Sequence, residues 1–455
     1  MNNRLSNKSS LLKPKVQQKR RVLCWADFSL SSTGFGKVAK HILDSIHNTG
    51  LYEIDHLAIN FYGEFYSKEE VPYTVIPSRL DNPQDPYGSQ MFINALQKKD
   101  YDLVFICNDT FVVEEVAKHI NEIKDVKKQK KQTVFKLVYY YPVDCRLLPE
   151  ASTMVKVADR SVAYTNFAKQ SSLDIGVQCT DVIYHGADVK NFFPISKEER
   201  KACRKQYLGI DSDDIFVWVT GNRNNPRKDI AKTLMAFVEF KNKICSNSKL
   251  YAHTKIVDNF GNGNGSDLRP LINELKIDIT KDIIFPNKYS AAKGFPVNVL
   301  NQLINCGDAF ITNNLGEGYG LFLVDSMSAG VPVVSPNHTS APEILGFNGL
   351  EEEVRGYPID CKERCYIDLS GSRPLSRMED ILSVMEIVYK DWLASKDQGD
   401  PEYIKERKNY RKGIINRGIA WTKQYSWDNI CKDWIKLFDE TYHTKIKNDL
   451  NGEII

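Results

Sequence analysis

Short, continuously apolar segments that alternate with helical patterns constrain the fold of this chain more than any other feature. The first of them, RVLCWA (21–26), is followed by a Ser/Gly turn and then by the helical pattern GKVAKHILDSI. Runs of this kind lack the strict alternation of a half-solvated strand, and they are typical of parallel strands that are covered on both faces. Helices between such strands indicate an α/β fold.

The apolar runs fall into two series that are separated by a polar connector near 188–200. The first series comprises 21–26, 102–108, 135–143, 160–165 and 181–188, and the second comprises 215–222, 249–255, 282–286, 308–314 and 331–336. Each series is long enough for a sheet of its own. We therefore predict two doubly wound, Rossmann-like domains that face each other across a central cleft.

The length of 455 residues agrees with this division, because one ordinary hydrophobic core rarely serves a chain of that size. We expect a flexible basic tail over 1–20 and domains over 21–190 and 191–415, followed by a C-terminal segment over 416–455. Within that segment, 426–443 carries Trp427, Trp434 and Phe438 on one helical face, which indicates a packed amphipathic helix.

Composition excludes several classes of protein. The net charge of +3 gives no reason to expect nucleic acid as a partner. The ten cysteines include only one close pair, Cys361 and Cys365, so we expect reduced thiols rather than a zinc site or a disulfide framework. No window is long and apolar enough to span a membrane, and the polar N-terminus is no signal peptide. We expect a cytoplasmic protein, with the basic run 124–131 leaving peripheral membrane association as an alternative.

Three glycine-containing turns each follow an expected strand. In the first, 29–43, Gly34 and Gly36 would let a ligand approach the backbone at the start of a helix. A full dinucleotide fingerprint needs a third glycine, but that position is Ala39. Glu53 and Asp55 are the candidates for a ribose-binding acid, in a stretch where a strand is poorly supported. A nicotinamide-dependent enzyme is therefore disfavoured.

The second turn, VTGNRNNPRKDI (219–230), places Arg223 and Lys228 on a loop between a strand and a helix, with Arg227 as a third cation. A guanidinium offers a planar fork of donors and an ammonium offers a point charge, and together they suit a diphosphate. A solvated basic turn is the alternative interpretation.

The third turn, LGEGYG, lies between the strand 308–314 and the helical pattern LFLVDSMSAG. Gly318 and Gly320 open the helix, whose free amides and dipole favour a phosphate group. Glu317 lies on the turn, and Asp325 follows eight residues later, a helical rise of ~12 Å. That span is comparable to the reach from a sugar to a ribose across a diphosphate. A helix cap plus one surface acid is the alternative.

With these motifs, the chain resembles glycosyltransferase family 4, retaining enzymes of the GT-B fold, from about residue 20 to 440. EGYGLFLVD matches the family's E-x7-E motif, and SMSAGVPVVSPNHTSAPEIL matches the segment that follows it. GNRNNPRK is similar to the family's Arg and Lys loop, and VIYHGADVKNFFP to the end of its first domain. The glycine turn at 33–36 matches the N-terminal loop on the donor side.

The resemblance implies a role for each part. Residues 21–190 would bind the acceptor and 191–415 the nucleotide-sugar donor, and the last helix would return to the first domain. Glu317 would contact hydroxyls of the transferred sugar, and Asp325 would bind the ribose. The diphosphate would be held by Arg223 and Lys228. The remaining donor contacts would come from Gly34, Gly36, Gly318, Tyr319, Gly320 and Leu321.

The sequence departs from the family pattern at two positions. Asp325 stands where the family has Glu, which shortens the reach of that carboxylate. Val143 stands where many members carry a histidine, which leaves Asp144 as the polar candidate for contact with the acceptor or the sugar. His253 either faces the cleft as a second such contact or is a packed histidine.

The function implied is transfer of a hexose, with retention, from a nucleotide diphosphate sugar to a hydroxyl of a glycan, lipid or protein-linked acceptor. We expect no cofactor and no required metal, because a pair of cations would neutralise the diphosphate. Two alternatives stay open. One is a nucleotide-sugar epimerase or hydrolase on the same fold, and the other is a degenerate nucleotide-sugar-binding protein without catalysis.

Overall fold

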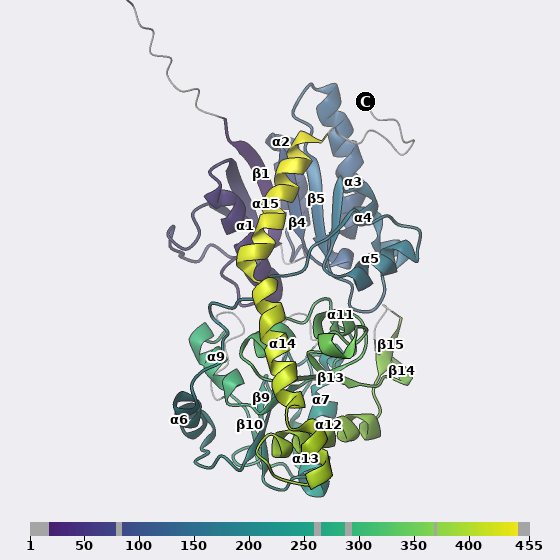
Figure 1. The fold of residues 1–455 in the computed structure, drawn as a ribbon. Coiled ribbons are helices and arrows are strands. Elements are labelled where there is room, and N and C mark those ends of the chain that lie inside the picture. The colour runs from purple at the N-terminus through teal and green to yellow at the C-terminus, as the bar shows by residue number, and fades with distance from the viewer. Residues whose placement is uncertain (1–17, 79–83, 259–264, 287–293, 368–370, 445–455) are drawn as a thin grey trace, which may run out of the picture.

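The computed structural model describes residues 18–78, 84–258, 265–286, 294–367 and 371–444. Residues 1–17 of the expected basic tail lie outside these ranges. The described chain forms two α/β halves, one above the other in Figure 1, and each is built on a parallel sheet. The expectation of two doubly wound, Rossmann-like domains is thereby confirmed.

The first half contains a seven-stranded parallel sheet in the order β3-β2-β1-β4-β5-β6-β7. Its strands are β1 (Arg20–Asp27), β2 (Tyr52–Ile59), β3 (Thr74–Pro77), β4 (Leu103–Cys107), β5 (Lys136–Tyr141), β6 (Arg160–Ala163) and β7 (Asp181–Val182). Its helices are α1 (Gly34–Asn48), α2 (Ser89–Lys98), α3 (Thr110–Gln129), η1 (Pro149–Ala151), α4 (Thr153–Val157) and α5 (Asn166–Leu173). The apolar strands β1 and β4 lie at the centre and are almost entirely buried.

The second half contains a six-stranded parallel sheet in the order β10-β9-β8-β11-β12-β13 and a small antiparallel hairpin, β14-β15. The strands are β8 (Phe216–Gly221), β9 (Ser248–His253), β10 (Ile283–Ile284), β11 (Ala309–Ile311), β12 (Val333–Pro336), β13 (Gly356–Ile359), β14 (Glu363–Tyr366) and β15 (Ser372–Leu375). The helices are α6 (Lys197–Leu208), η2 (Pro226–Lys228), α7 (Ile230–Lys243), α8 (Arg269–Glu274), α9 (Val297–Asn305), α10 (Leu321–Ser328), α11 (Ala341–Leu345), η3 (Glu351–Glu353), α12 (Met378–Ala394) and α13 (Pro401–Arg407).

Every strand expected from an apolar run is present, but the doubt about a strand near residues 53–55 was wrong. β2 pairs with β1 along its whole length, from Tyr52 to Ile59. Its pattern was obscured because it carries two buried polar side chains. The carboxylate of Asp55 accepts hydrogen bonds from Lys99 and from Tyr101, at 2.5 Å and 2.8 Å. Buried polar groups are tolerated where such partners exist, and here the partners lie far along the chain.

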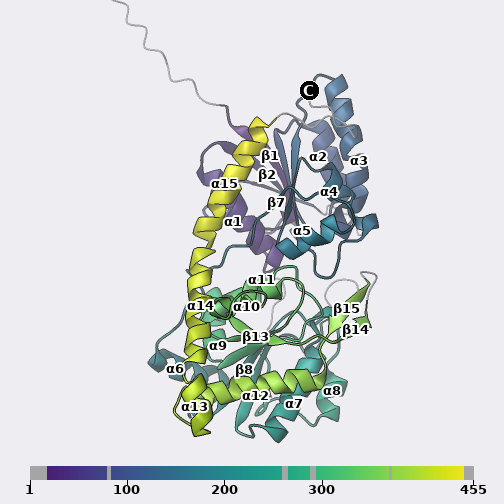
Figure 2. The ribbon, with the colours of Figure 1, turned by 45° about the vertical axis from the view of Figure 1, so that its right-hand side comes forward.

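Two helices at the C-terminus connect the halves. α14 (Tyr410–Gln424) packs against α10 of the second half, and α15 (Trp427–His443) packs against α1 of the first. The yellow helices in Figures 1 and 2 therefore run along both halves. At the junction, Ala187 pairs with Ser426, so the two chain segments that cross between the halves lie side by side.

The helix expected over 426–443 is confirmed as α15, and Trp434 is its central anchor. The indole is fully buried, with its ring centroid 4.7 Å from that of Tyr140 and 5.5 Å from that of Phe105. We expect Trp434→Ala to lower the free energy of unfolding by about 3–5 kcal/mol, because it leaves a large cavity. Urea denaturation measures this loss. Lys436→Ala, at an exposed position of the same helix, is the control, and equal effects for both would contradict this packing.

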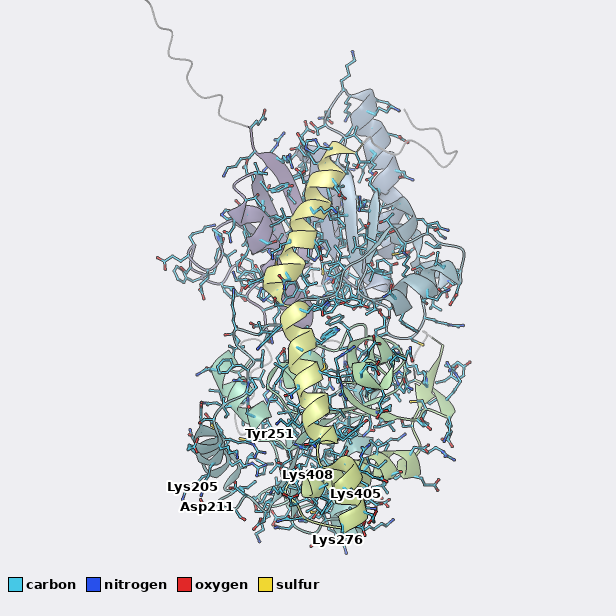
Figure 3. All side chains as sticks on the ribbon, in the orientation of Figure 1. Lys205, Asp211, Tyr251, Lys276, Lys405 and Lys408 are labelled. Carbon is cyan, nitrogen blue, oxygen red and sulfur yellow. The ribbon has the colours of Figure 1, made fainter. Side chains whose placement is uncertain are left out.

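Two exposed ion pairs lie in the second half, away from the first half. Lys205 and Asp211, labelled in Figure 3, form an ion pair at 3.0 Å. Lys408, also labelled, pairs with Asp397 at 2.5 Å. Exposed pairs of this kind contribute little to stability. Among the helices that the structure describes, none is long and apolar enough to cross a membrane.

Candidate active site

A cavity of about 540 Å³ lies between the two halves. On the first half its walls come from the chain beyond β1, β2, β4, β5, β6 and β7, and on the second half from the chain beyond β8, β9 and β11. These strands are neighbours in their sheets, and each wall-forming loop follows the carboxyl end of its strand. In open α/β sheets this edge is the usual place for a ligand. The glycine turns and the basic loop singled out from the sequence meet here.

Lys228 and Glu317 form the centre of the cavity wall on the second half. The Lys228 ammonium lies 2.5 Å from Glu317 Oε1, which also accepts a hydrogen bond from Asn314 at 2.7 Å. Burial lowers the pKa of Lys228 to about 8, and the Arg227 charge acts in the same direction. Burial raises the pKa of Glu317, but the Lys228 and Arg227 charges outweigh it, so that the pKa is lowered. Both groups are therefore charged near neutral pH.

Arg227, which the sequence singled out only as an additional cation, connects three parts of the site. Its Nε lies 3.0 Å from Asp144 of the first half, and its Nη1 donates to the carbonyl of Gly316 at 2.5 Å. The same Nη1 lies 3.8 Å from Glu317. Since a guanidinium presents its donors in a fixed fork, Arg227 fixes the Glu317 turn relative to the first half.

Arg223 lies at the more open part of the same loop. Its side chain is 46% exposed, lines the cavity, and pairs with Asp258 through Nε at 3.2 Å. The structure therefore brings Arg223 and Lys228 to one cavity, as their spacing suggested. It also shows that each is paired with a carboxylate in the absence of a ligand. A bound anion would share these cations with those acids.

The glycine turn before α1 forms the facing wall. Thr33 is the N-cap of α1: its hydroxyl accepts from the Gly36 amide at 3.1 Å and donates to Asp27 at 2.6 Å. Gly34 lines the cavity, and a Cβ there would lie 3.3 Å from Leu321 at the start of α10. Gly36 does not line it. A Cβ at Gly36 would lie 2.5 Å from the carbonyl of Phe28, so this glycine serves the packing of the turn.

The start of α10 places Gly318, Tyr319, Gly320 and Leu321 in the cavity wall. The helix begins only at Leu321, after Gly320 in the left-handed region at φ 96°. Glu317 therefore lies outside the helix, and the helical rise used to relate it to Asp325 does not apply over the whole interval. The turn approaches the first half closely, since a Cβ on Gly316 would lie 1.7 Å from the carbonyl of Asp144.

Asp325 is buried on α10 and is not among the residues that line the cavity. Burial raises its pKa to about 7, although Lys37 of α1 lowers it in part, and Asp188 adds to the increase. The structure thus brings Asp325 close to the first half rather than to the open cavity. A contact with a ribose would require a small shift of α10 or of the ligand.

Asp325 should make stability depend on pH. The folded protein keeps this proton up to about pH 7, whereas the unfolded chain releases it near 3.8. The native state then binds more protons, so stability falls as pH rises between these values. We expect Asp325→Asn to raise the free energy of unfolding by about 4 kcal/mol at pH 8 and by less than about 1 kcal/mol at pH 4. Denaturation at both pH values measures the difference, and an equal gain at both would contradict it.

Asp144 and His253, the two candidates for contact with the acceptor or the sugar, both contact other side chains of the protein. Asp144 lines the cavity, but its carboxylate is bound by Arg227 and by the buried Arg373 of β15, at 3.2 Å. His253 is buried, its Nδ1 lies 2.9 Å from the Tyr251 hydroxyl, and its ring packs on Phe295. Burial lowers the pKa of His253 to about 4. His253 is not among the residues that line the cavity, so the packed interpretation describes it.

Sequence reasoning missed several side chains of the cavity wall. Asp27 is the last residue of β1, Asp109 lies just beyond the end of β4, and both line the cavity. The rule that ligands bind beyond the carboxyl ends of parallel strands would have pointed to both. His185 also lines the cavity, packed between tyrosine rings. It lies beyond β7, within the segment that resembles the end of the family's first domain, and no role was assigned to it there.

Among the described residues, no group of three or more His, Cys, Asp or Glu side chains is placed to hold a metal ion. Arg223, Arg227 and Lys228 instead form ion pairs with carboxylates of the cavity wall. The arrangement suits a ligand with a diphosphate, which would meet Arg223 and Lys228, and with hydroxyls, which would meet Glu317.

The GT-B fold consists of two Rossmann-like domains with a cavity between the carboxyl edges of their sheets. Its C-terminal helix returns to the first domain, as α15 does here. Solved structures agree over almost the whole chain. The sucrose-phosphate synthase of Thermosynechococcus elongatus has a TM-score of 0.63 at 13% identity, covering 93% of this chain and 99% of that one. Anabaena HepE in complex with UDP-glucose has a TM-score of 0.60 at 15% identity, covering 92% and 99%. Starch synthase IV of Arabidopsis thaliana, bound to ADP and acarbose, has a TM-score of 0.63 at 12% identity, covering 94% of this chain and 100% of that one.

Sequence comparison gives a narrower similarity. No protein-family model matches the chain. The O-antigen chain mannosyltransferase B of Escherichia coli is 27% identical over 143 residues, which are 31% of this chain and 28% of that protein. The match therefore spans less than a third of the relative's length. It agrees with the resemblance to glycosyltransferase family 4, and the structural similarities confirm the GT-B fold that this resemblance implied.

Proposed function

We propose that the protein is a retaining glycosyltransferase that moves a hexose from a nucleotide diphosphate sugar to a hydroxyl of a glycan, lipid or protein-linked acceptor. One observation carries the proposal. The cation loop after β8 and the acidic turn before α10 meet as the Lys228–Glu317 pair, inside a cavity between two Rossmann-like domains. The cations that would bind the diphosphate thus lie next to the Glu317 carboxylate, which would accept hydrogen bonds from the hydroxyls of the sugar.

In the proposed reaction, the bond between the anomeric carbon and the leaving diphosphate breaks, and a bond to the acceptor oxygen forms on the same face. The proton of the acceptor hydroxyl passes to an oxygen of the leaving diphosphate. Arg223 and Lys228 stabilise the charge that develops on that group, while Glu317 accepts hydrogen bonds from the transferred sugar. Such a site acts through positioning and preorganised charge. Because these cations neutralise the diphosphate, we propose that no metal is required.

The donor is the first point to test. The relative that is a mannosyltransferase makes GDP-mannose the first candidate, and UDP and ADP hexoses complete the panel. We expect one nucleotide class to raise the melting temperature of the wild type, because a ligand that binds only the folded state stabilises it. Lys228→Met should reduce the shift, because it removes one of the cations that would hold the diphosphate. A wild type that responds to none of these sugars would contradict a donor site.

Product analysis separates the proposal from its enzymatic and non-enzymatic alternatives. With methyl hexopyranosides as acceptors, we expect a disaccharide whose new linkage keeps the anomeric configuration of the donor, as read by NMR. An altered nucleotide sugar would indicate an epimerase. Free hexose, formed equally fast with and without acceptor, would indicate a hydrolase. Tight binding without any turnover would indicate a binding protein.

We also propose a cytoplasmic location. All ten cysteines are free thiols, and most are buried. Reduced cysteines are typical of proteins in reducing compartments. A peripheral contact with a membrane, through which a lipid-linked acceptor would be reached, is compatible with this location.

A further inference from the structure

The five acids that line the inter-domain cavity are not equivalent. They are Asp27, Asp109, Asp144, Asp258 and Glu317. Four of these carboxylates are already bound by side chains: Asp27 by Thr33, Asp144 by Arg227 and Arg373, Asp258 by Arg223, and Glu317 by Lys228 and Asn314. Their positions are thereby fixed before any ligand binds.

Asp109 is different. It precedes α3 at the N-cap position, but its side chain does not cap the helix. Among the residues that the structure describes, no donor forms a hydrogen bond or an ion pair with its carboxylate. Burial raises its pKa to about 7, and the neighbouring charge of Asp144 acts in the same direction. Asp109 is half-buried and lines the cavity, so its carboxylate is open to a ligand that supplies the missing donor.

The position of Asp109 indicates which ligand that is. It follows β4, which lies between β1 and β5 in the first sheet, so Asp109 stands in the middle of the first-half wall. The cations and the acid assigned to the donor stand on the opposite wall. Arg227 and Asp144 are close enough to influence the Asp109 charge, and Arg227 in turn lies 3.8 Å from Glu317. A hydroxyl bound at Asp109 would therefore face the transferred sugar.

We propose that the Asp109 carboxylate binds the acceptor, by accepting a hydrogen bond from a hydroxyl of its sugar or polyol. The inference rests on the proposed function and adds the residue that positions the second substrate. Asp109 orients the acceptor, and the proton that leaves the attacking hydroxyl still passes to the diphosphate. Carboxylates are suited to this task, because they only accept hydrogen bonds when ionised and bind neighbouring hydroxyls in pairs.

The test compares Asp109→Asn with Glu115→Gln. The second change removes one charge from the same helix at a side chain that is 77% exposed. Both variants and the wild type are assayed with the preferred nucleotide sugar and with the methyl hexopyranoside that the wild type uses fastest. Three quantities are measured: the melting-temperature shift caused by the donor, hydrolysis of the donor in water, and KM and kcat for the acceptor.

We expect Asp109→Asn to raise the acceptor KM at least tenfold, while the donor shift and donor hydrolysis stay within twofold of wild type. Glu115→Gln should match the wild type in all three. An unchanged acceptor KM would overturn the inference. Loss of the donor shift in Asp109→Asn would also overturn it, by assigning Asp109 to the donor sugar. A wild type without donor binding would instead contradict the proposed function itself, so the two failures are distinguishable.

Discussion

Replacing Lys228 by methionine should lower donor turnover by about 10²–10³-fold, because it removes a preorganised cation from the place where the leaving diphosphate gains charge. The side chain is largely buried and lies 2.5 Å from Glu317. Methionine keeps most of the length and the apolar stem but carries no charge. Steady-state release of the nucleotide diphosphate, measured with saturating donor, gives the loss directly.

The same substitution should also destabilise the protein, by about 3 kcal/mol, because Glu317 remains buried without its closest cation. The double variant Lys228→Met/Glu317→Gln removes both charges. We expect it to recover most of the lost stability but none of the activity, since neither group is then available to the donor. This contrast separates a catalytic loss from a folding defect.

A matched control exists on the neighbouring helix. Lys243 and Glu239 of α7 form an exposed pair at 2.5 Å. The corresponding changes, Lys243→Met and Glu239→Gln, should alter stability by less than about 0.5 kcal/mol and leave turnover unchanged. If Lys228→Met turned over donor at the rate of this control, the assigned role of Lys228 would be wrong.

Arg227→Gln should lower turnover by about 10²-fold, because Arg227 fixes the Glu317 turn relative to the first half. Small displacements of a positioning group are enough for losses of this size. Asp144→Asn should act in the same direction, since it removes the partner of Arg227 across the cavity. Turnover of the two single variants and of the double variant forms a complete cycle.

The cycle should be strongly non-additive. We expect a coupling of at least about 1 kcal/mol between Arg227 and Asp144, as is usual for residues in one network. The exposed pair Arg269 and Asp267, at 2.6 Å, provides the control cycle. Its coupling should be near zero. Additive effects at Arg227 and Asp144 would show that the contact between the halves does not position the site.

The sequence predicted the strands whose apolar runs are continuous, such as β1 and β4. β2 was not, because Asp55 and His56 interrupt its apolar pattern. Their partners are tertiary: Lys99 and Tyr101 bind Asp55, and Ser29 lies 3.4 Å from His56. The local sequence does not indicate that buried polar side chains of a strand will find hydrogen-bond partners elsewhere in the chain.

The sequence predicted those residues of the site that belong to one contiguous motif. Arg223 and Lys228 share one loop, and the glycines share one turn with Glu317, so the order of the chain already brings each group together. Asp109 belongs to no such motif, because its place in the wall follows from the order of the strands in the sheet. The pairing of Asp144 with Arg373 joins residues 229 positions apart and likewise had no local signal.

The most direct measurement of the central claim is turnover of nucleotide sugars by the wild type, Arg223→Ala and Glu317→Ala. Chromatography of the released nucleotide diphosphate is sufficient, with GDP-mannose tested first and UDP and ADP hexoses after it. We predict turnover of one donor by the wild type and at least a hundredfold loss in each variant. Turnover that is unchanged in both variants would contradict a donor site built from the cation loop and the acidic turn.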